Sequence, residues 1–157
     1  MKVAIISDTH NKIAKVYDNL LDKNIDIIIH LGDVCDDAMI LSDLLNVEVI
    51  NVKGNNDFYV AGGDYEKVIR LSGKNIFITH GHKYNVSYGV DELVKKSKSL
   101  NCDMCLYGHT HRYFNEKIDG IWVINPGSPT YPRDGQAGFL IYDTKNNEIE
   151  RILLWTY

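Results

Sequence analysis

Short runs of apolar residues alternate with segments of helical spacing along the first third of the chain. The runs predict strands that are covered on both faces, and they span residues 3–7, 25–31 and 47–52. Between them, apolar residues recur at helical spacing over residues 13–21 and 40–45, which predicts two amphipathic helices. The order strand, helix, strand, helix, strand predicts right-handed parallel crossovers, and the carboxyl ends of such strands gather functional groups.

Polar residues mark the expected ends of these helices. Asp36 or Asp37 can cap the second helix, because a carboxylate accepts hydrogen bonds from the free N–H groups of a first turn. Asn24 and Asn46 follow the two helices, and asparagine readily adopts the left-handed conformation found at helix ends. Asn101 stands in the same place after a third helical pattern further along the chain.

Beyond residue 64 the pattern changes to hairpins. A helical pattern remains at residues 90–100 and a short strand at 103–107, but the other segments are pairs of strands around two-residue turns. The paired strands are expected at residues 65–71 and 75–79, 112–118 and 121–125, and 137–143 and 148–155. Because no linker or composition break divides the chain, we predict a single α/β domain over residues 1–157, in which two sheets pack as layers.

The composition is that of an ordinary globular protein. Of the 157 residues, 45% are hydrophobic and 24% are charged, and the formal net charge is -4. That charge argues against binding to nucleic acid or to an anionic membrane surface. The first apolar run is broken by Asp8, so it is too short for a signal peptide or a membrane span, and we expect a cytoplasmic protein. The sequence leaves open whether the chain forms a homo-oligomer.

Three cysteines fit the same compartment, because an odd small number does not make a disulfide framework. Cys102 and Cys105 have the two-residue gap of a zinc knuckle, but no second such pair exists to complete four sulfur ligands. We therefore expect buried, small hydrophobic side chains.

Histidines and carboxylates supply the candidate chemistry. His109 and His111, one residue apart, would face the same side of an extended backbone, and Gly108 before them would let the chain turn to present both rings. Asp8 and His10 repeat this spacing with a carboxylate first. Both pairs are candidate metal ligands.

Single donors follow the other predicted strands. The full candidate set is Asp8, His10, Asp33, Asn55, His80, His109 and His111. Seven oxygen and nitrogen donors are too many for one tetrahedral site and suit two metals that share a ligand. Two divalent cations about 3.5 to 4 Å apart repel by about 17 kcal/mol at an effective dielectric of 20, so an anion must bridge them. Two metals, two Asp ligands and a hydroxide leave a charge near +1, which favours a phosphate substrate.

These donors form blocks that resemble a known family. In chain order the blocks are Asp8-x-His10, Gly32-Asp33, Gly54-Asn55-Asn56-Asp57, His80-Gly81 and Gly108-His109-x-His111. They resemble the five signature blocks of the calcineurin-like metallophosphoesterase superfamily. With Thr79-His80-Gly81-His82 and Asn125-Pro126-Gly127-Ser128, the chain is most similar to the small bacterial and archaeal phosphodiesterases of that superfamily. The resemblance implies an α/β/β/α sandwich with two central sheets.

The resemblance also implies roles for the donors and the reaction. Asp8, His10, Asp33 and His111 would hold one metal, and Asp33, Asn55, His80 and His109 would hold the other, with Asp33 as the bridge. Manganese is the first choice, and iron, zinc or nickel also suit oxygen and imidazole ligands. A hydroxide that bridges the metals would attack the phosphorus of a small-molecule phosphodiester in line, while both metals hold phosphoryl oxygens.

One position departs from the family pattern. Many members have histidine directly after the Asn ligand, where it can protonate the leaving group, whereas this chain has Asn56 followed by Asp57. Asn56 can donate a hydrogen bond but cannot transfer a proton, which argues against monoesterase activity. Together with Asp33 and His82, which can line the site or support it, Asn56 and Asp57 form the predicted catalytic group.

Other residues and functions remain as alternatives. His30 is expected to be a buried, hydrogen-bonded side chain, and Arg133 is either a phosphate contact or a solvated surface residue. Tyr84, Tyr88 and Tyr131 could form an aromatic wall, although core or surface positions are the default. The alternative function is a non-catalytic scaffold that resembles a retromer subunit of the same fold, but the ligand set here is complete. A serine hydrolase is excluded because the chain lacks a Gly-x-Ser-x-Gly elbow.

Overall fold

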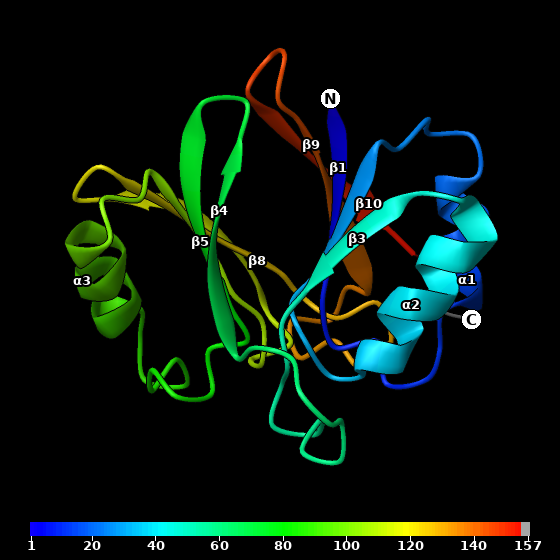
Figure 1. Ribbon diagram of the computed structural model, residues 1–157, viewed down its shortest axis with the longest axis horizontal. Coiled ribbons are helices and arrows are strands. Elements are labelled where there is room, and N and C mark those ends of the chain that lie inside the picture. The colour runs from blue at the N-terminus through cyan, green and yellow to red at the C-terminus, as the bar shows by residue number, and fades with distance from the viewer. Residues whose placement is uncertain (155–157) are drawn as a thin grey trace.

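The computed structural model describes residues 1–154 and folds them into two five-stranded sheets with helices outside (Figure 1). The strands of the first sheet are β1 (Lys2–Ile6), β2 (Ile27–His30), β3 (Glu48–Asn51), β9 (Gly138–Asp143) and β10 (Glu148–Leu153). Those of the second sheet are β4 (Glu66–Leu71), β5 (Lys74–Thr79), β6 (Met104–Leu106), β7 (Tyr113–Ile118) and β8 (Ile121–Pro126). The helices are α1 (Ala14–Leu20), α2 (Cys35–Leu45) and α3 (Asp91–Ser99). Every predicted element is present, although the predicted end of the last strand, Trp155, lies outside the described residues.

The first sheet has the order β10-β9-β1-β2-β3. β1 runs parallel to β2 and β2 parallel to β3, which confirms the two predicted crossovers through α1 and α2. The β9–β10 hairpin joins this sheet rather than the second one, because β9 pairs antiparallel with β1. Both ends of the described chain therefore meet in one sheet.

The second sheet has the order β4-β5-β6-β8-β7. The predicted hairpins β4–β5 and β7–β8 are antiparallel and form its two edges. β6 lies between them and runs parallel to both β5 and β8. Parallel strands occupy the middle of this sheet, so the loops after β5 and β6 leave it at the same end.

The two sheets pack face to face around one inner core. Ile5 and Ile29 of the first sheet meet Ile78 and Leu106 of the second, and all four are almost completely buried. Each fully buried side chain of this size contributes about 1.5–3 kcal/mol to stability.

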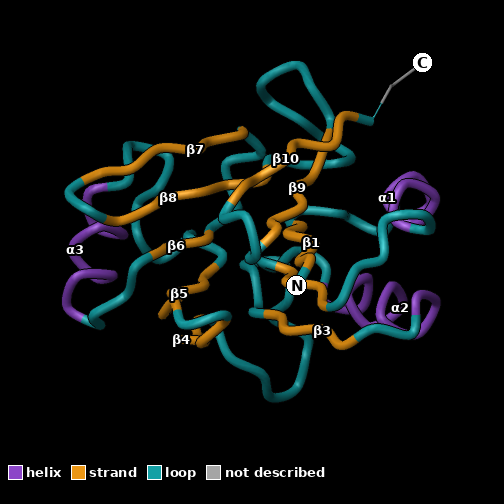
Figure 2. The backbone as a smooth tube through the Cα atoms, turned by 90° about the horizontal axis from the view of Figure 1, so that it is seen from above, coloured by secondary structure: helices purple, strands orange, loops and turns teal. Residues whose placement is uncertain are grey.

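The outer face of each sheet is covered by helices. Because side chains alternate along a strand, Ala4 and Ile6 point to the opposite face from Ile5, where they pack against Val16 and Leu41 of α1 and α2. On the outer face of the second sheet, α3 packs against β5 and its neighbours. Viewed from above, the layers follow one another as helices, sheet, sheet and helix (Figure 2). The predicted α/β/β/α sandwich is confirmed.

The ends of α2 differ from the prediction in one respect. The N-cap is Val34, which has no side-chain cap, and Asp36 and Asp37 lie within the first turn. The first free N–H, that of Cys35, instead donates to the Asp57 carboxylate at 2.8 Å, so a distant residue satisfies the helix end. At the other end Asn46 is left-handed with a φ of 53°, as expected.

The cysteines behave as small hydrophobic residues. Cys35, Cys102 and Cys105 are buried free thiols, and burial raises the pKa of Cys105 to about 12. The expected burial of all three cysteine side chains is confirmed. Among the described residues, no helix is long and apolar enough to cross a membrane.

Candidate metal centre

All seven predicted donors lie in loops that leave the carboxyl ends of β1, β2, β3, β5 and β6. The two sheets contribute together, since Asp8 follows β1 and His80 follows β5. Asp8 and His80 lie within two residues of their strands, whereas Asn55 lies four residues after β3, because β3 ends sooner than predicted. The donors converge where the two sheets meet.

Asp8 lies at the centre of the site and is completely buried. Its Oδ2 accepts hydrogen bonds from the Ser7 hydroxyl at 2.7 Å and from the His109 backbone N–H at 3.0 Å. Its other oxygen, Oδ1, is buried without a hydrogen-bond partner. One oxygen thus fixes the carboxylate and leaves the other aimed at its histidine neighbours.

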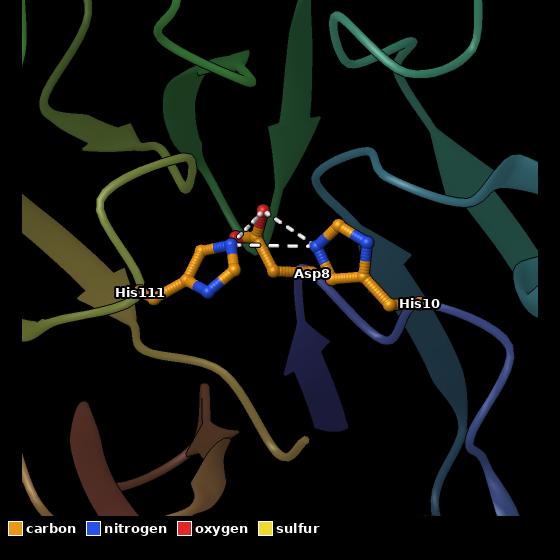
Figure 3. Close-up of side chains that lie close together, drawn as sticks. All are labelled: Asp8, His10 and His111. Atoms are coloured by element: carbon orange, nitrogen blue, oxygen red, sulfur yellow. Dashed lines mark hydrogen bonds and ion pairs between the residues drawn. The ribbon is translucent and has the colours of Figure 1, made fainter. Parts of the chain in front are cut away.

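His10 and His111 approach Asp8 from two sides (Figure 3). The His111 Nε2 lies 3.3 Å from Asp8 Oδ1 and 3.3 Å from the His10 Nε2. The His10 Nε2 lies 4.0 Å from the same oxygen and 3.9 Å from Asp33 Oδ2. Asp8, His10 and His111 therefore form a group that could hold a metal ion.

A second possible metal-binding group shares Asp8 and adds Asp33 and His80. The buried His80 Nε2 lies 3.5 Å from Asp33 Oδ2 and 3.7 Å from Asp8 Oδ1, and it has no hydrogen-bond partner. The carboxylates of Asp8 and Asp33 thus lie between His80 on one side and the pair His10 and His111 on the other.

Backbone carbonyls select the tautomers of two of these rings. The Nδ1 of His80 lies 2.7 Å from the Leu31 carbonyl, and the Nδ1 of His111 lies 2.7 Å from the Tyr131 carbonyl. Because a carbonyl only accepts, each Nδ1 donates, and in the neutral rings each Nε2 is left with a lone pair. Both lone pairs face Asp8 Oδ1, an arrangement of acceptors that requires a proton or a cation between them.

The electrostatics of the site agree with this geometry. Burial would raise the pKa of Asp8, but the close contact with His111 and the charges of His80 and His111 outweigh it, and that pKa lies below its usual value. Burial would lower the pKa of His80, yet Asp33 and Asp8 together raise it. Close contact with Asp8 raises the pKa of His111 in the same way, against the effect of burial. The carboxylates therefore favour positive charge at both imidazoles.

His109, Asn55 and His82 lie at the His80 end of the site. The His109 Nδ1 is 3.1 Å from Asn55 Oδ1, and the His109 and His80 ring centroids are 5.2 Å apart. The His82 ring centroid is 5.5 Å from that of His80, and its buried Nδ1 has no partner. Burial and the neighbouring His80 and His109 lower the pKa of His82 to about 4, so this ring is neutral.

Asn56 and Asp57 support different parts of Asp33, its carboxylate and its backbone. Asn56 is exposed and donates to the Asp33 carboxylate from its backbone N–H at 3.0 Å and from its side-chain amide at 2.7 Å. Asp57 is completely buried, and its carboxylate accepts the backbone N–H groups of Asp33 at 2.9 Å, Gly54 at 2.7 Å and Cys35 at 2.8 Å. Asp57 therefore holds the loops that carry Asp33 and Asn55, beneath the site rather than in it.

Residues at the end of β8 and just after it tie the donor loops together. The Asn125 side chain donates to the Gly108 carbonyl at 3.0 Å, and the Ser128 hydroxyl donates to the Asp8 carbonyl at 2.8 Å. Asn125 and Ser128 belong to the Asn-Pro-Gly-Ser motif that the sequence analysis noted, but their function as supports was not predicted. Ser7, next to Asp8, had no signal in the sequence.

The backbone of the donor loops differs from the predicted extended form. Five donors are left-handed, with φ of 58° at Asp8, 46° at His10, 49° at Asp33, 69° at His109 and 57° at His111. Such values are uncommon for residues with a side chain and concentrate at functional sites. They allow His109 to turn toward Asn55 while His111 turns toward His10.

Two glycines are required by close contacts. A Cβ at Gly54 would lie 2.0 Å from Asp33 Oδ1, and a Cβ at Gly108 would lie 2.0 Å from the Ser7 Oγ. The sequence analysis attributed Gly108 to a sharp turn, but it is not among the glycines with positive φ. The need for glycine there is steric crowding against Ser7 and Asp8.

The remaining candidate residues differ in their distance from the site and in their burial. His30 is buried and hydrogen-bonded as expected, to the Thr9 hydroxyl at 3.0 Å, and burial lowers its pKa to about 4. Tyr131 borders the site, with its ring centroid 5.7 Å from that of His10. Tyr84 is partly buried against Phe77, and Tyr88 is 93% exposed, so the three tyrosines do not form one wall.

Known proteins of similar sequence agree with the expected family. The model of the calcineurin-like phosphoesterase superfamily domain matches residues 1–147. A phosphodiesterase from Methanocaldococcus jannaschii is 32% identical, over 98% of this chain and 99% of that protein. A probable metallophosphoesterase from Bacillus subtilis is 30% identical, over 96% of this chain and 95% of that protein.

Solved structures share the fold. An archaeal phosphodiesterase superimposes with a TM-score of 0.80 at 29% identity, over 98% of this chain and all of that one. Vps29 from Entamoeba histolytica, in complex with zinc, gives a TM-score of 0.81 at 24% identity, over 98% of this chain and 99% of that one. At that identity the likeness concerns the fold alone.

Proposed function

Because this chain belongs to the calcineurin-like phosphoesterase superfamily, we propose that it is a metal-dependent phosphodiesterase that hydrolyses a small-molecule phosphodiester. The observation that carries the proposal is the pair of buried, unpartnered atoms at the centre of the site, Asp8 Oδ1 and His80 Nε2. They lie 3.7 Å apart. Buried polar atoms are seldom left without a partner, so this pair supports a cation as the missing one.

The donor set fits two divalent metals. Carboxylate, amide oxygen and neutral imidazole are ligands that manganese accepts, and iron, zinc and nickel accept them as well. Asp8, His10, Asp33 and His111 would hold one metal, and Asp33, Asn55, His80 and His109 the other. When bound, the two metals would activate a water molecule for in-line attack and stabilise the charge that develops on the phosphoryl oxygens.

Asp33 is the proposed bridge between the metals. The distances from its Oδ2 to the histidines of the two groups, 3.9 Å to His10 Nε2 and 3.5 Å to His80 Nε2, support that function. Asp8 Oδ1 is also close to both groups, but the second oxygen of Asp8 is held by Ser7 and His109. The Asp33 carboxylate instead accepts hydrogen bonds from Asn56, which is exposed to solvent.

The residues beside the metals have separate functions in this proposal. Asn56 reaches Asp33 from the solvent side, where its amide can donate a hydrogen bond to a phosphoryl oxygen. It cannot supply a proton to the leaving group, so substrates with stable leaving groups are favoured. Asp57 positions the loops through its backbone hydrogen bonds, and neutral His82 lines the His80 end of the site.

The test combines elemental analysis with turnover. The protein saturated with manganese is expected to hold two metals per chain and to cleave aryl phosphodiesters. Asp33→Asn should lower occupancy at both positions, whereas His10→Ala should mainly empty one. Asp43→Asn, an exposed carboxylate on α2, is the matched control and should change neither. At most one metal in the saturated wild-type protein would refute a binuclear centre.

A scaffold function is the second candidate, and an exposed apolar surface on α2 favours it. Met39, Ile40 and Leu44 are 47–54% exposed there. The complete donor set favours the enzyme. A metal-loaded protein with no turnover on any mono- or diester, together with a stable protein complex that α2 mutations disrupt, would support the scaffold instead.

A further inference from the structure

A pocket of about 450 Å³ opens beside the candidate metal centre. Thr110, which lies between His109 and His111 in the chain, forms part of its wall. Arg133 also lines it and donates its backbone N–H to the His111 carbonyl at 2.9 Å. The pocket therefore lies next to the loop that carries His109 and His111, and its volume falls in the range of small-molecule sites.

One side of the pocket is apolar. Val86, Val90 and Phe114 line it, and they belong to or pack against the core between α3 and the second sheet. Phe114 is only partly buried, and its ring packs edge-on against Tyr107 with the centroids 6.3 Å apart. These side chains suit an apolar or aromatic ligand group.

The other side carries positive charge. Arg112 and Arg133 both line the pocket and are exposed, and no carboxylate lines it. Within residues 1–154, neither guanidinium forms an ion pair or hydrogen bond. Asp134, next to Arg133, is engaged instead by Arg151 and by the backbone N–H of Tyr113. Two unpaired guanidinium groups in a chain with 21 acidic and 17 basic residues suit an anionic ligand.

We propose that this pocket binds one ester arm of the substrate, and that this arm combines a flat apolar ring with a second phosphate group. The proposal rests on the phosphodiesterase function and extends it. None of the described residues that line the pocket is a histidine or carries a carboxylate, and arginine cannot give up its proton, so the pocket offers none of the usual general acids for a departing alkoxide. The arm bound there is accordingly the one that stays on phosphorus.

Three diesters that release the same leaving group test this. Each is a p-nitrophenyl phosphate, and the three differ in the second ester arm. That arm is methyl in the first and thymidine, attached through its 5′ oxygen, in the second. In the third it is the same thymidine with an additional 3′-phosphate. With manganese bound, kcat/KM is expected to rise along the series, by about tenfold for the 3′-phosphate. In Arg112→Gln/Arg133→Gln that last gain should fall to about twofold or less, while Arg70→Gln, an exposed arginine on β4, keeps it in full.

Binding of thymidine 3′,5′-bisphosphate to the metal-loaded protein provides a measurement that does not need turnover. Calorimetry should show affinity about tenfold weaker in the double variant than in the wild type or in Arg70→Gln, with unchanged circular dichroism in all three. Equal affinity in the double variant would overturn the pocket proposal, whatever the hydrolysis rates. If the arginines govern binding but the wild type cleaves none of the three diesters, the pocket proposal stands and the proposed function fails.

Discussion

The Asp57 carboxylate holds three loop N–H groups beneath the site, so Asp57→Asn should weaken the fold before it affects any chemistry. Asp57 is completely buried, and its two oxygens accept the backbone N–H groups of Asp33, Gly54 and Cys35 at 2.7–2.9 Å. Asparagine has nearly the same shape but only one acceptor oxygen. The substitution therefore removes hydrogen bonds without creating a cavity.

The size of the effect follows from which bonds survive. The asparagine oxygen can keep the two hydrogen bonds from the N–H groups of Asp33 and Gly54. The asparagine NH₂ group then faces the N–H of Cys35, and because both are donors no hydrogen bond can form there. Losing one charge-assisted bond and leaving that buried N–H without a partner costs about 2–4 kcal/mol. Asp57→Ala loses all three bonds and should cost about 4–6 kcal/mol, much of the stability of a domain this size.

Urea unfolding of the metal-free protein, followed by circular dichroism, measures this cost. Asp64→Asn is the matched control. The Asp64 side chain is 67% exposed and its ion pair with Lys67 is long, at 3.9 Å, so the substitution should change the free energy of unfolding by less than about 0.5 kcal/mol. A metal titration should show affinity reduced about 10- to 100-fold in Asp57→Asn, since the loops of Asp33 and Asn55 lose their support. Wild-type stability combined with lost turnover in Asp57→Asn would refute the positioning function and indicate direct catalysis.

Three further predictions concern other parts of the site and its surroundings. Asn56→His restores a group that can transfer a proton, so it should speed cleavage of alkyl esters about 10²-fold while leaving aryl diesters nearly unchanged, and equal slopes of log rate against leaving-group pKa in both proteins would contradict this. Gly108→Ala should lower the free energy of unfolding by about 2–3 kcal/mol, because its Cβ would lie 2.0 Å from the Ser7 Oγ. In urea unfolding, the double variant Ser7→Ala/Gly108→Ala should recover part of that loss. If the effects of the two substitutions simply add, the steric explanation is contradicted. Burial would raise the pKa of Asp134, but hydrogen bonds from the Tyr113 and Gln136 backbones, together with Arg151, hold that pKa below its usual value. The contribution of Asp134 to stability should therefore be present above about pH 4 and be lost as the pH falls through the lower folded-state pKa. Asp134→Asn should accordingly cost about 1 kcal/mol at pH 7 after solvent screening and progressively less as the pH falls below about 4. A pH-independent cost measured by denaturant unfolding would contradict this.

Local pattern was sufficient to predict the helices and strands. Apolar runs and helical spacing located every element within a few residues, and turn residues such as Asp119 and Gly120 identified the hairpins. The pattern did not predict that β9 pairs with β1, because an apolar run reports burial on both faces but not the identity of the neighbouring strand. The donor residues were identified from their order in the chain, and the structure brings them together.

The support of the site depends on contacts that spacing cannot reveal. The N–H of Cys35 is satisfied by Asp57, 22 residues away, so no local cap was needed at α2 and neither Asp36 nor Asp37 provides one. Similarly, Gly108 is required by Ser7, about a hundred residues earlier, and not by its own backbone conformation. Such pairs are set by the packing of loops from different strands, which the sequence of either loop does not contain.

The left-handed backbone at five of the seven donors has a consequence for the evolution of this protein. Such a conformation costs about 1–2 kcal/mol for each residue with a side chain, so the five together cost about 5–10 kcal/mol. Selection for stability alone would replace these residues with glycine, which adopts the same backbone freely. A lineage that abandoned the chemistry should therefore accumulate glycine at these positions first.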